Sequence, residues 1–131
     1  MNGSVAEGAE IRVLVVDDHQ VVREGLVELL NRESDIAVIG QAASGAKATE
    51  MALHLVPDLI LMDINMPGMD GIEATRSIIS VLPEVRIIGL SIDGSRATID
   101  EMLSAGAVGY VRKESSFGEI VAAIREHAEK A

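Results

Sequence analysis

Cysteine and tryptophan are absent from this chain of 131 residues. Without cysteine the protein forms no disulfide and no thiolate metal site, which suits a reducing cytoplasm. Aromatic residues are scarce too, with one Tyr and one Phe, so the core must consist of aliphatic residues, alanine and methionine. No apolar run approaches the roughly 20 residues that span a bilayer. We therefore expect a cytoplasmic protein with no membrane partner.

Basic residues are outnumbered, with 11 Lys and Arg against 21 Asp and Glu and a net charge of −10. This balance disfavours binding of nucleic acid by this domain and is compatible with cations or basic partner surfaces. The opening MNGSVAEGAE lacks the basic and apolar parts of a signal peptide. We expect residues 1–10 to be a disordered tail or a remnant of cloning, and residues 11–131 to form one domain.

Short aliphatic runs alternate five times with segments of helical periodicity. Ser44 is a suitable N-cap, Gly106 a suitable C-terminal stop, and Pro57 and Pro83 interrupt the pattern. The predicted strands are 11–16, 35–42, 58–63, 85–91 and 108–113. The predicted helices are 20–32, 44–55, 72–82, 95–107 and 116–130.

This alternation predicts an α/β fold, because continuous aliphatic strands are typical of a parallel sheet covered on both faces. Right-handed crossovers then give a flavodoxin-like doubly wound sheet of five parallel strands, in the order 2-1-3-4-5, with five helices. A closed barrel is disfavoured, because barrels of this type need about eight repeats.

Polar residues follow four of the predicted strands. Asp17 and Asp18 end the first strand, Asp63 the third, Ser91 the fourth and Lys113 the fifth. In open α/β sheets, ligands bind at the carboxyl ends of the strands, beside the point where strand order reverses. We therefore expect these five side chains to converge at one edge of the sheet.

Three carboxylates in one crevice call for a hard divalent cation, and Mg²⁺ suits because it binds carboxylate, water and phosphate oxygens. With Lys113 as a second positive charge, Asp63 could attack a phosphoryl group and form an acyl phosphate. The Ser91 hydroxyl would share the charge of the transferring group. His19 stands beside the acid pair and can influence it, whereas His54 and His127 lie on predicted helices without partners.

The segments VVDDH, LMDINMPGMDG, GLS and GYVRK occur in this order on these elements. With them the chain resembles the receiver domain of a two-component response regulator, from Ile11 to about Ala128. The DDH after the first strand and the GAVGYVRK before the last helix are most similar to NarL/FixJ-type receivers, which usually precede a DNA-binding domain. Such an output domain is missing from this chain.

The resemblance implies a metal site and a phosphate acceptor. Asp63 matches the family's phosphoryl acceptor and also a metal ligand. Asp18 matches the direct metal ligand, and Asp17 the acid that binds the metal through water. Asn65 matches the position whose backbone carbonyl completes the magnesium site.

The resemblance also implies a switch. Ser91 matches the hydroxyl that bonds the phosphoryl oxygen and shifts when it arrives, and Lys113 the lysine that pairs with the phosphoryl group. Tyr110 matches the aromatic residue that rotates inward with that shift. The phosphoryl donor would be a histidine kinase or a phosphotransfer protein, and phosphorylation could drive homodimerisation. The output surface would be made by the fourth predicted helix, the fifth strand and the fifth helix, with Ile99, Met102, Leu103, Tyr110 and Ile120.

Two positions depart from the family's pattern. Glu114 follows Lys113 where many receivers have a proline, and Ile92 follows Ser91 where many have Ala or Gly. We predict that Ile92 narrows access to the acyl phosphate and slows its exchange with small phosphodonors and with water.

Three other functions fit the sequence less well than a receiver. An aspartyl-nucleophile phosphohydrolase of the haloacid-dehalogenase kind is disfavoured, because Asn65 stands where a general acid would be needed and no cap insertion is present. A phosphate-independent domain of the same fold is disfavoured, because such domains usually lose one of the five polar residues. A flavin carrier would need an aromatic to stack on the ring. We therefore expect a protein that catalyses only its own phosphorylation and dephosphorylation.

Overall fold

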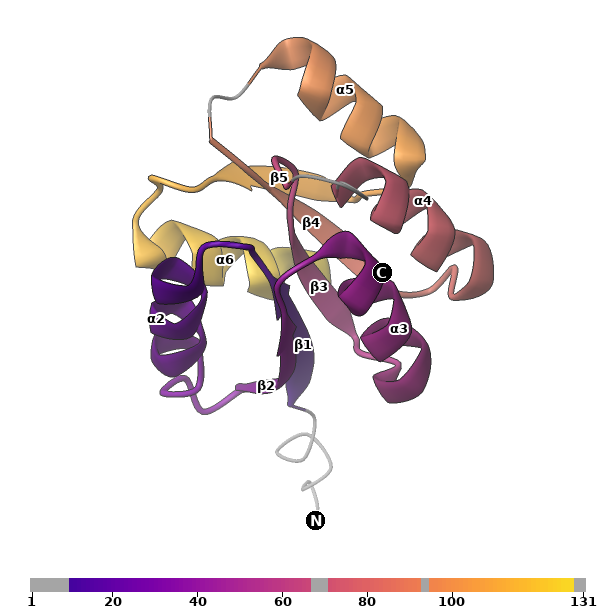
Figure 1. The fold of residues 1–131 in the computed structure, drawn as a ribbon. Coiled ribbons are helices and arrows are strands. Elements are labelled where there is room, and N and C mark those ends of the chain that lie inside the picture. The colour runs from indigo at the N-terminus through magenta and orange to yellow at the C-terminus, as the bar shows by residue number, and fades with distance from the viewer. Residues whose placement is uncertain (1–9, 67–70, 93–94, 129–131) are drawn as a thin grey trace.

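A computed structural model describes residues 10–66, 71–92 and 95–128. Five strands alternate with five helices along the chain, as predicted (Figure 1). The strands are β1 (Ile11–Val16), β2 (Ile36–Ala42), β3 (Leu59–Asp63), β4 (Arg86–Ser91) and β5 (Gly109–Arg112). The helices are α2 (Gln20–Leu30), α3 (Gly45–Leu55), α4 (Gly71–Val81), α5 (Arg96–Ala105) and α6 (Phe117–Ala128).

The five strands form one parallel sheet in the order β2-β1-β3-β4-β5, which confirms the predicted topology. The direction of winding reverses between β1 and β3, so the ends of these two strands lie beside each other. Val16 pairs with Met62, which places Asp17 next to Asp63 at the carboxyl edge. Leu90 pairs with Asp63 and Ser91 with Arg112, so the residues that follow β4 and β5 reach the same edge.

Side chains alternate along each strand and build a core on both faces of the sheet. Leu14, Ile60 and Met62 pack with buried residues of α3, α4 and α5. Val13, Leu61 and their neighbours pack instead with α2 and α6. The two groups of helices lie on opposite sides of the sheet in Figure 1.

Local signals fixed the helix ends to within two residues. The Ser44 side chain accepts a hydrogen bond from the Lys47 backbone N–H at 3.1 Å, which is the predicted N-cap. Gly106 ends α5 with a φ of 121°, a backbone conformation that residues other than glycine rarely adopt. The ends of the predicted helices beyond Leu30 and Ala105 are wrong, because the chain turns there rather than continuing its helical hydrogen bonds.

Of the predicted tail, residues 1–10, the structure describes only Glu10, which is exposed; residues 129–131 also lie outside the described residues. Within the described parts of the chain, no helix is both long and apolar enough to cross a bilayer.

The predicted output patch is largely wrong. Met102 is fully buried, and Ile99 and Ile120 are each only 6% exposed. Met102 and Ile120 pack in the cores on the two faces of the sheet. Leu103 and Tyr110 do reach the surface, with exposures of 41% and 44%.

Candidate functional site

The end of β1 forms a tight turn around the Asp17 carboxylate. The Asp17 side chain is fully buried, and its Oδ1 accepts a hydrogen bond of 2.8 Å from the His19 backbone N–H. This bond, from the residue two positions on, is the turn that an aspartate favours after a strand. It points Asp17 into the crevice and leaves Asp18 more open, with 29% of its side chain exposed.

Lys113 joins the ends of β1 and β3. Its Nζ lies 2.9 Å from Asp17 Oδ2 and 3.1 Å from Asp63 Oδ2, and only 14% of its side chain is exposed. The Lys113 backbone N–H donates to the Ser91 carbonyl at 2.8 Å, which fixes the lysine beside β4. One cation from the end of β5 thus contacts two fully buried carboxylates from two neighbouring strands.

The three ionisable groups of this cluster differ in how strongly their surroundings favour the charged form. Burial raises the pKa of the Asp63 carboxyl, and the negative charge of Asp17 raises it further. The Asn65 N–H and the Lys113 ammonium lower this pKa, but by less. Burial also opposes ionisation of Asp17, but the His19 N–H and Lys113 outweigh it and lower the pKa of Asp17. Burial disfavours the Lys113 ammonium, yet the two carboxylates raise its pKa. Asp63 is therefore the carboxylate that gains most from another cation.

The loop after β3 holds Asp63 and connects it to the end of β4. The Asn65 backbone N–H donates to Asp63 Oδ1 at 2.9 Å, and the Asn65 side-chain Oδ1 accepts from the Ile92 N–H at 3.2 Å. Ser91, one residue before Ile92, is fully buried. These two hydrogen bonds link the end of β4 to Asp63 through Asn65.

Glycine is required where α4 begins. A Cβ on Gly71 would collide with the backbone carbonyl of Asp63. The start of α4 therefore packs directly against the peptide that carries the central carboxylate, which leaves Asp63 little freedom to move.

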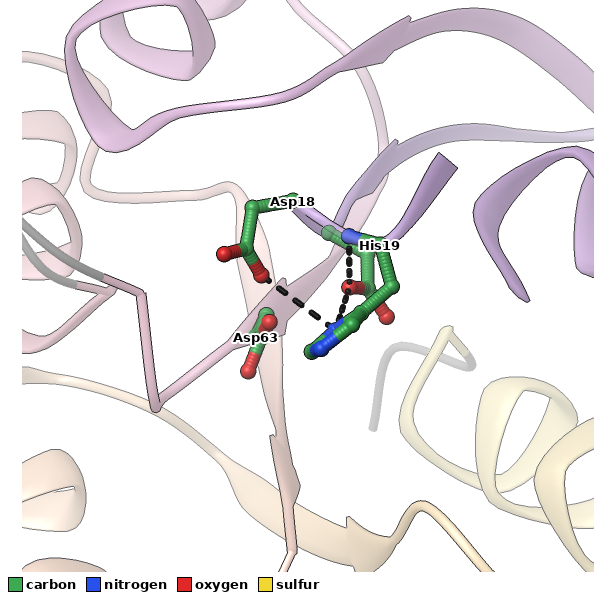
Figure 2. Close-up of side chains that lie close together, drawn as sticks. Asp18, His19 and Asp63 are labelled. Carbon is green, nitrogen blue, oxygen red and sulfur yellow. Dashed lines mark hydrogen bonds and ion pairs between the residues drawn. The ribbon is translucent and has the colours of Figure 1, made fainter. Parts of the chain in front are cut away.

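The cluster fits a metal ion. One potential ligand atom from each of Asp17, Asp18, His19 and Asp63 lies within 4.8 Å of the others. In Figure 2 the side chains of Asp18, His19 and Asp63 point toward one another. Asp17 Oδ2 is buried, and the Lys113 ammonium lies 2.9 Å from it. A buried carboxylate oxygen of this kind suits a hard cation such as Mg²⁺.

Comparison with known proteins decides the family. A family profile described as "Response regulator receiver domain" matches residues 13–125.

The chain belongs to the response-regulator receiver family.

Curated relatives of this receiver include the transcriptional regulatory protein LiaR of Bacillus subtilis, 45% identical over 115 residues, covering 88% of the chain and 54% of LiaR. The response regulator GacA of Pseudomonas viridiflava is 41% identical over 115 residues, with the same two shares of 88% and 54%. The receiver thus spans about half the length of the curated relatives it matches.

Solved structures agree with the fold. The signal receiver domain of the response regulator NarL from Mycobacterium tuberculosis superposes with a TM-score of 0.88 at 35% identity, covering 93% of this chain and 98% of that one. The receiver is therefore of the NarL type that its sequence resembles, with the predicted doubly wound fold.

Sequence reasoning brought together most of the residues that the receiver's structure gathers, but it missed the contact of the Asn65 side chain. That side chain binds the Ile92 N–H, whereas only the Asn65 carbonyl was expected to act. His19, which was expected to influence the acid pair, lies close to Asp17 and Asp18 through one ring nitrogen. The same nitrogen also lies 3.3 Å from the Lys113 ammonium, a contact that the sequence did not suggest.

The two departures from the receiver pattern lie at the rim of the site. Glu114 forms an ion pair with Arg112 on the surface. The Ile92 side chain is 47% exposed, and the Ile92 backbone N–H binds the Asn65 side chain. Tyr110, on β5, is 44% exposed.

Proposed function

We propose that Asp63 accepts a phosphoryl group from the phosphohistidine of a histidine kinase or a phosphotransfer protein. One observation carries the proposal: the buried Asp63 carboxylate, whose pKa is raised, lies 3.1 Å from the Lys113 ammonium and beside Asp17 and Asp18. This arrangement gives a nucleophile and a receptor for phosphoryl oxygens in one crevice.

Mg²⁺ is the cofactor we propose, held by the carboxylates of Asp17, Asp18 and Asp63 and by the backbone carbonyl of Asn65. When bound, it would neutralise the carboxylates and the negative charge of the incoming phosphoryl group. The ligand atoms of Asp17, Asp18 and Asp63, which lie within 4.8 Å of one another, support this assignment.

The transfer is a displacement at phosphorus. An oxygen of Asp63 forms a bond to phosphorus while the bond from phosphorus to the donor's imidazole nitrogen breaks, and the electron pair remains on that nitrogen. Lys113 leaves its ion pair with Asp63 and pairs with a phosphoryl oxygen, and the Ser91 hydroxyl donates to another. Positioning and charge stabilisation account for catalysis in such transfers.

We propose that the protein acts on itself and not as an enzyme with multiple turnover. Asn65 cannot serve as a general acid, and its side-chain oxygen is already bonded to the Ile92 N–H. This supports a lasting acyl phosphate over the phosphohydrolase alternative.

Intact-mass analysis tests the assignment. With Mg²⁺ and acetyl phosphate, the parent should gain the mass of one phosphoryl group, whereas Asp63→Asn should gain none. Asp100→Asn is the matched control, because Asp100 is an exposed carboxylate on α5, and it should label like the parent. Equal labelling of Asp63→Asn and the parent would defeat the proposal.

An apolar surface on α2 supports a docking site for the phosphohistidine donor. Val21 is 85% exposed and Val22 50%, and both line a groove that continues to Asp17 and Lys113. A helix carrying the donor histidine could bury these side chains while its imidazole reaches Asp63.

The docking proposal predicts different effects on phosphorylation by two kinds of donor, a histidine kinase and acetyl phosphate. Val21→Asp should slow phosphorylation by a histidine kinase that labels the parent, and should leave labelling by acetyl phosphate unchanged. Val81→Asp is the matched control, since Val81 is 60% exposed on α4. A kinase that labels Val21→Asp as fast as the parent would refute the docking site.

The output surface that we propose lies on α5, β5 and α6. Tyr110 and Leu103 are its exposed apolar members. Ser91 pairs with Arg112 of β5, and its neighbour Leu90 pairs with Asp63, so the end of β4 lies between this surface and Asp63. Inward rotation of Tyr110 after phosphorylation would bias this surface toward a partner or a second copy of the chain.

We further propose that residues 11–131 act as the receiver unit of a cytoplasmic regulator whose DNA-binding part lies outside this sequence.

A further inference from the structure

His19 directs one ring nitrogen at three charged groups. Its Nδ1 lies 3.2 Å from Asp17 Oδ1, 3.4 Å from Asp18 Oδ1 and 3.3 Å from Lys113 Nζ. The two carboxylate oxygens call for a hydrogen on Nδ1, whereas the ammonium calls for a lone pair there. One nitrogen cannot meet both demands. A metal cation that takes the Nδ1 lone pair and both carboxylate oxygens would resolve the conflict.

The spacing of these atoms also suits a metal. Neighbouring ligands of an octahedral ion with bonds of 2.0–2.1 Å lie about 3.0 Å apart. Nδ1 and the two carboxylate oxygens are separated by 3.2 and 3.4 Å, so small movements bring all three onto one ion. The ring of His19 faces the same space as Asp18 and Asp63 in Figure 2. Because 55% of the His19 side chain is exposed, the ring has room to adjust.

We infer that His19 is a nitrogen ligand of the metal site, and that it gives this receiver an additional preference for divalent transition ions such as Mn²⁺, Co²⁺ and Ni²⁺. Imidazole suits these ions, whereas Mg²⁺ prefers oxygen donors and gains little from a nitrogen. The inference rests on the proposed function in that both use the same carboxylates. It goes further by assigning a ligand and a class of ion that Mg²⁺-dependent transfer does not need.

Any site of oxygen and nitrogen ligands binds Co²⁺ more tightly than Mg²⁺, so selectivity in the parent alone proves nothing. The test is the difference that His19 makes. Calorimetric titration with Co²⁺ and with Mg²⁺ should be run on the parent, His19→Ala and His19→Phe. The Phe variant keeps a flat ring but has no nitrogen. His54→Ala is the matched control, because His54 is an exposed histidine on α3.

Both His19 variants should bind Co²⁺ at least about tenfold more weakly, since changing even a partner of a metal ligand typically costs about 10- to 100-fold. Their Mg²⁺ affinity should stay within about twofold of the parent's, because Mg²⁺ keeps its oxygen ligands. His54→Ala should match the parent with both ions. In addition, the Co²⁺-loaded parent should show a hyperfine-shifted, exchangeable imidazole N–H proton signal that both His19 variants lack.

Equal losses of Co²⁺ and Mg²⁺ affinity in the His19 variants, or no loss of either, would overturn the inference. A Co²⁺ spectrum with the same shifted N–H signal in all variants would also overturn it. These results are independent of the proposed function, which is tested separately: it fails if the Mg²⁺-loaded parent gains no phosphoryl group from acetyl phosphate, or if Asp63→Asn labels like the parent.

Discussion

Replacing Lys113 by Met should destabilise the metal-free protein strongly. The ammonium lies 2.9 Å from one fully buried carboxylate and 3.1 Å from another. At an effective dielectric constant near 20, each contact corresponds to about 5–6 kcal/mol of gross Coulomb attraction. Recovered desolvation of the lysine, entry of water and protonation of Asp63 offset part of this loss. We expect the free energy of unfolding to fall by about 3–4 kcal/mol, within the range for breaking a buried ion pair.

Urea unfolding at neutral pH with a metal chelator present measures this loss. Lys47→Met is the matched control, since Lys47 is 58% exposed and lies 3.6 Å from Glu50, and it should cost no more than about 0.5 kcal/mol. Adding Mg²⁺ should restore more stability to Lys113→Met than to the parent, because the ion replaces the missing charge. A loss below about 1 kcal/mol, or an equal loss in an Asp63→Asn background, would refute the reasoning.

Three further predictions follow from the same contacts. Asp63→Asn should raise the urea midpoint at neutral pH, because burial raises the pKa of Asp63 and its ionised form therefore costs stability above that pKa. The gain in midpoint should shrink as the pH falls and the carboxyl of the parent becomes neutral. A variant with a lower midpoint than the parent at neutral pH would contradict this prediction. Arg125→Gln should lower the melting temperature slightly at neutral pH, because the Arg125 hydrogen bond lowers the pKa of Asp35 and that support is lost as the pH falls through the lowered value; an equal difference in acid would count against the ion pair. Ile92→Ala should speed both labelling by acetyl phosphate and decay of the acyl phosphate, measured by intact mass over time. Rates no faster than those of the parent would contradict the prediction that Ile92 narrows access to the acyl phosphate.

The fold was predictable because each element carries its own signal. Continuous aliphatic strands such as β3 predict burial on both faces, and the alternation with helices leaves few topologies. The flavodoxin-like order, one of the common doubly wound orders, places Asp17 beside Asp63. The convergence of the acids and Lys113 could be predicted for the same reason, since it depends only on which residue follows each strand.

Which residues of the predicted output patch reach the surface could not be predicted in the same way. Ile99 and Met102 have the spacing of one helix face, but the sequence does not say whether that face meets the sheet or solvent. The contacts of His19 and of the Asn65 side chain depend on how two loops close over the crevice. Such closure depends on side-chain packing between distant segments, which no local pattern records.

Reductive trapping of the phosphorylated protein tests the central claim most directly. Hydride reduction of an acyl phosphate on an aspartate leaves homoserine, which peptide mass analysis can locate. After incubation with Mg²⁺ and acetyl phosphate, homoserine should appear at position 63 and nowhere else, and it should be absent when the metal is chelated. Homoserine at another acid, or labelling of Asp63 that does not depend on a divalent ion, would contradict the account.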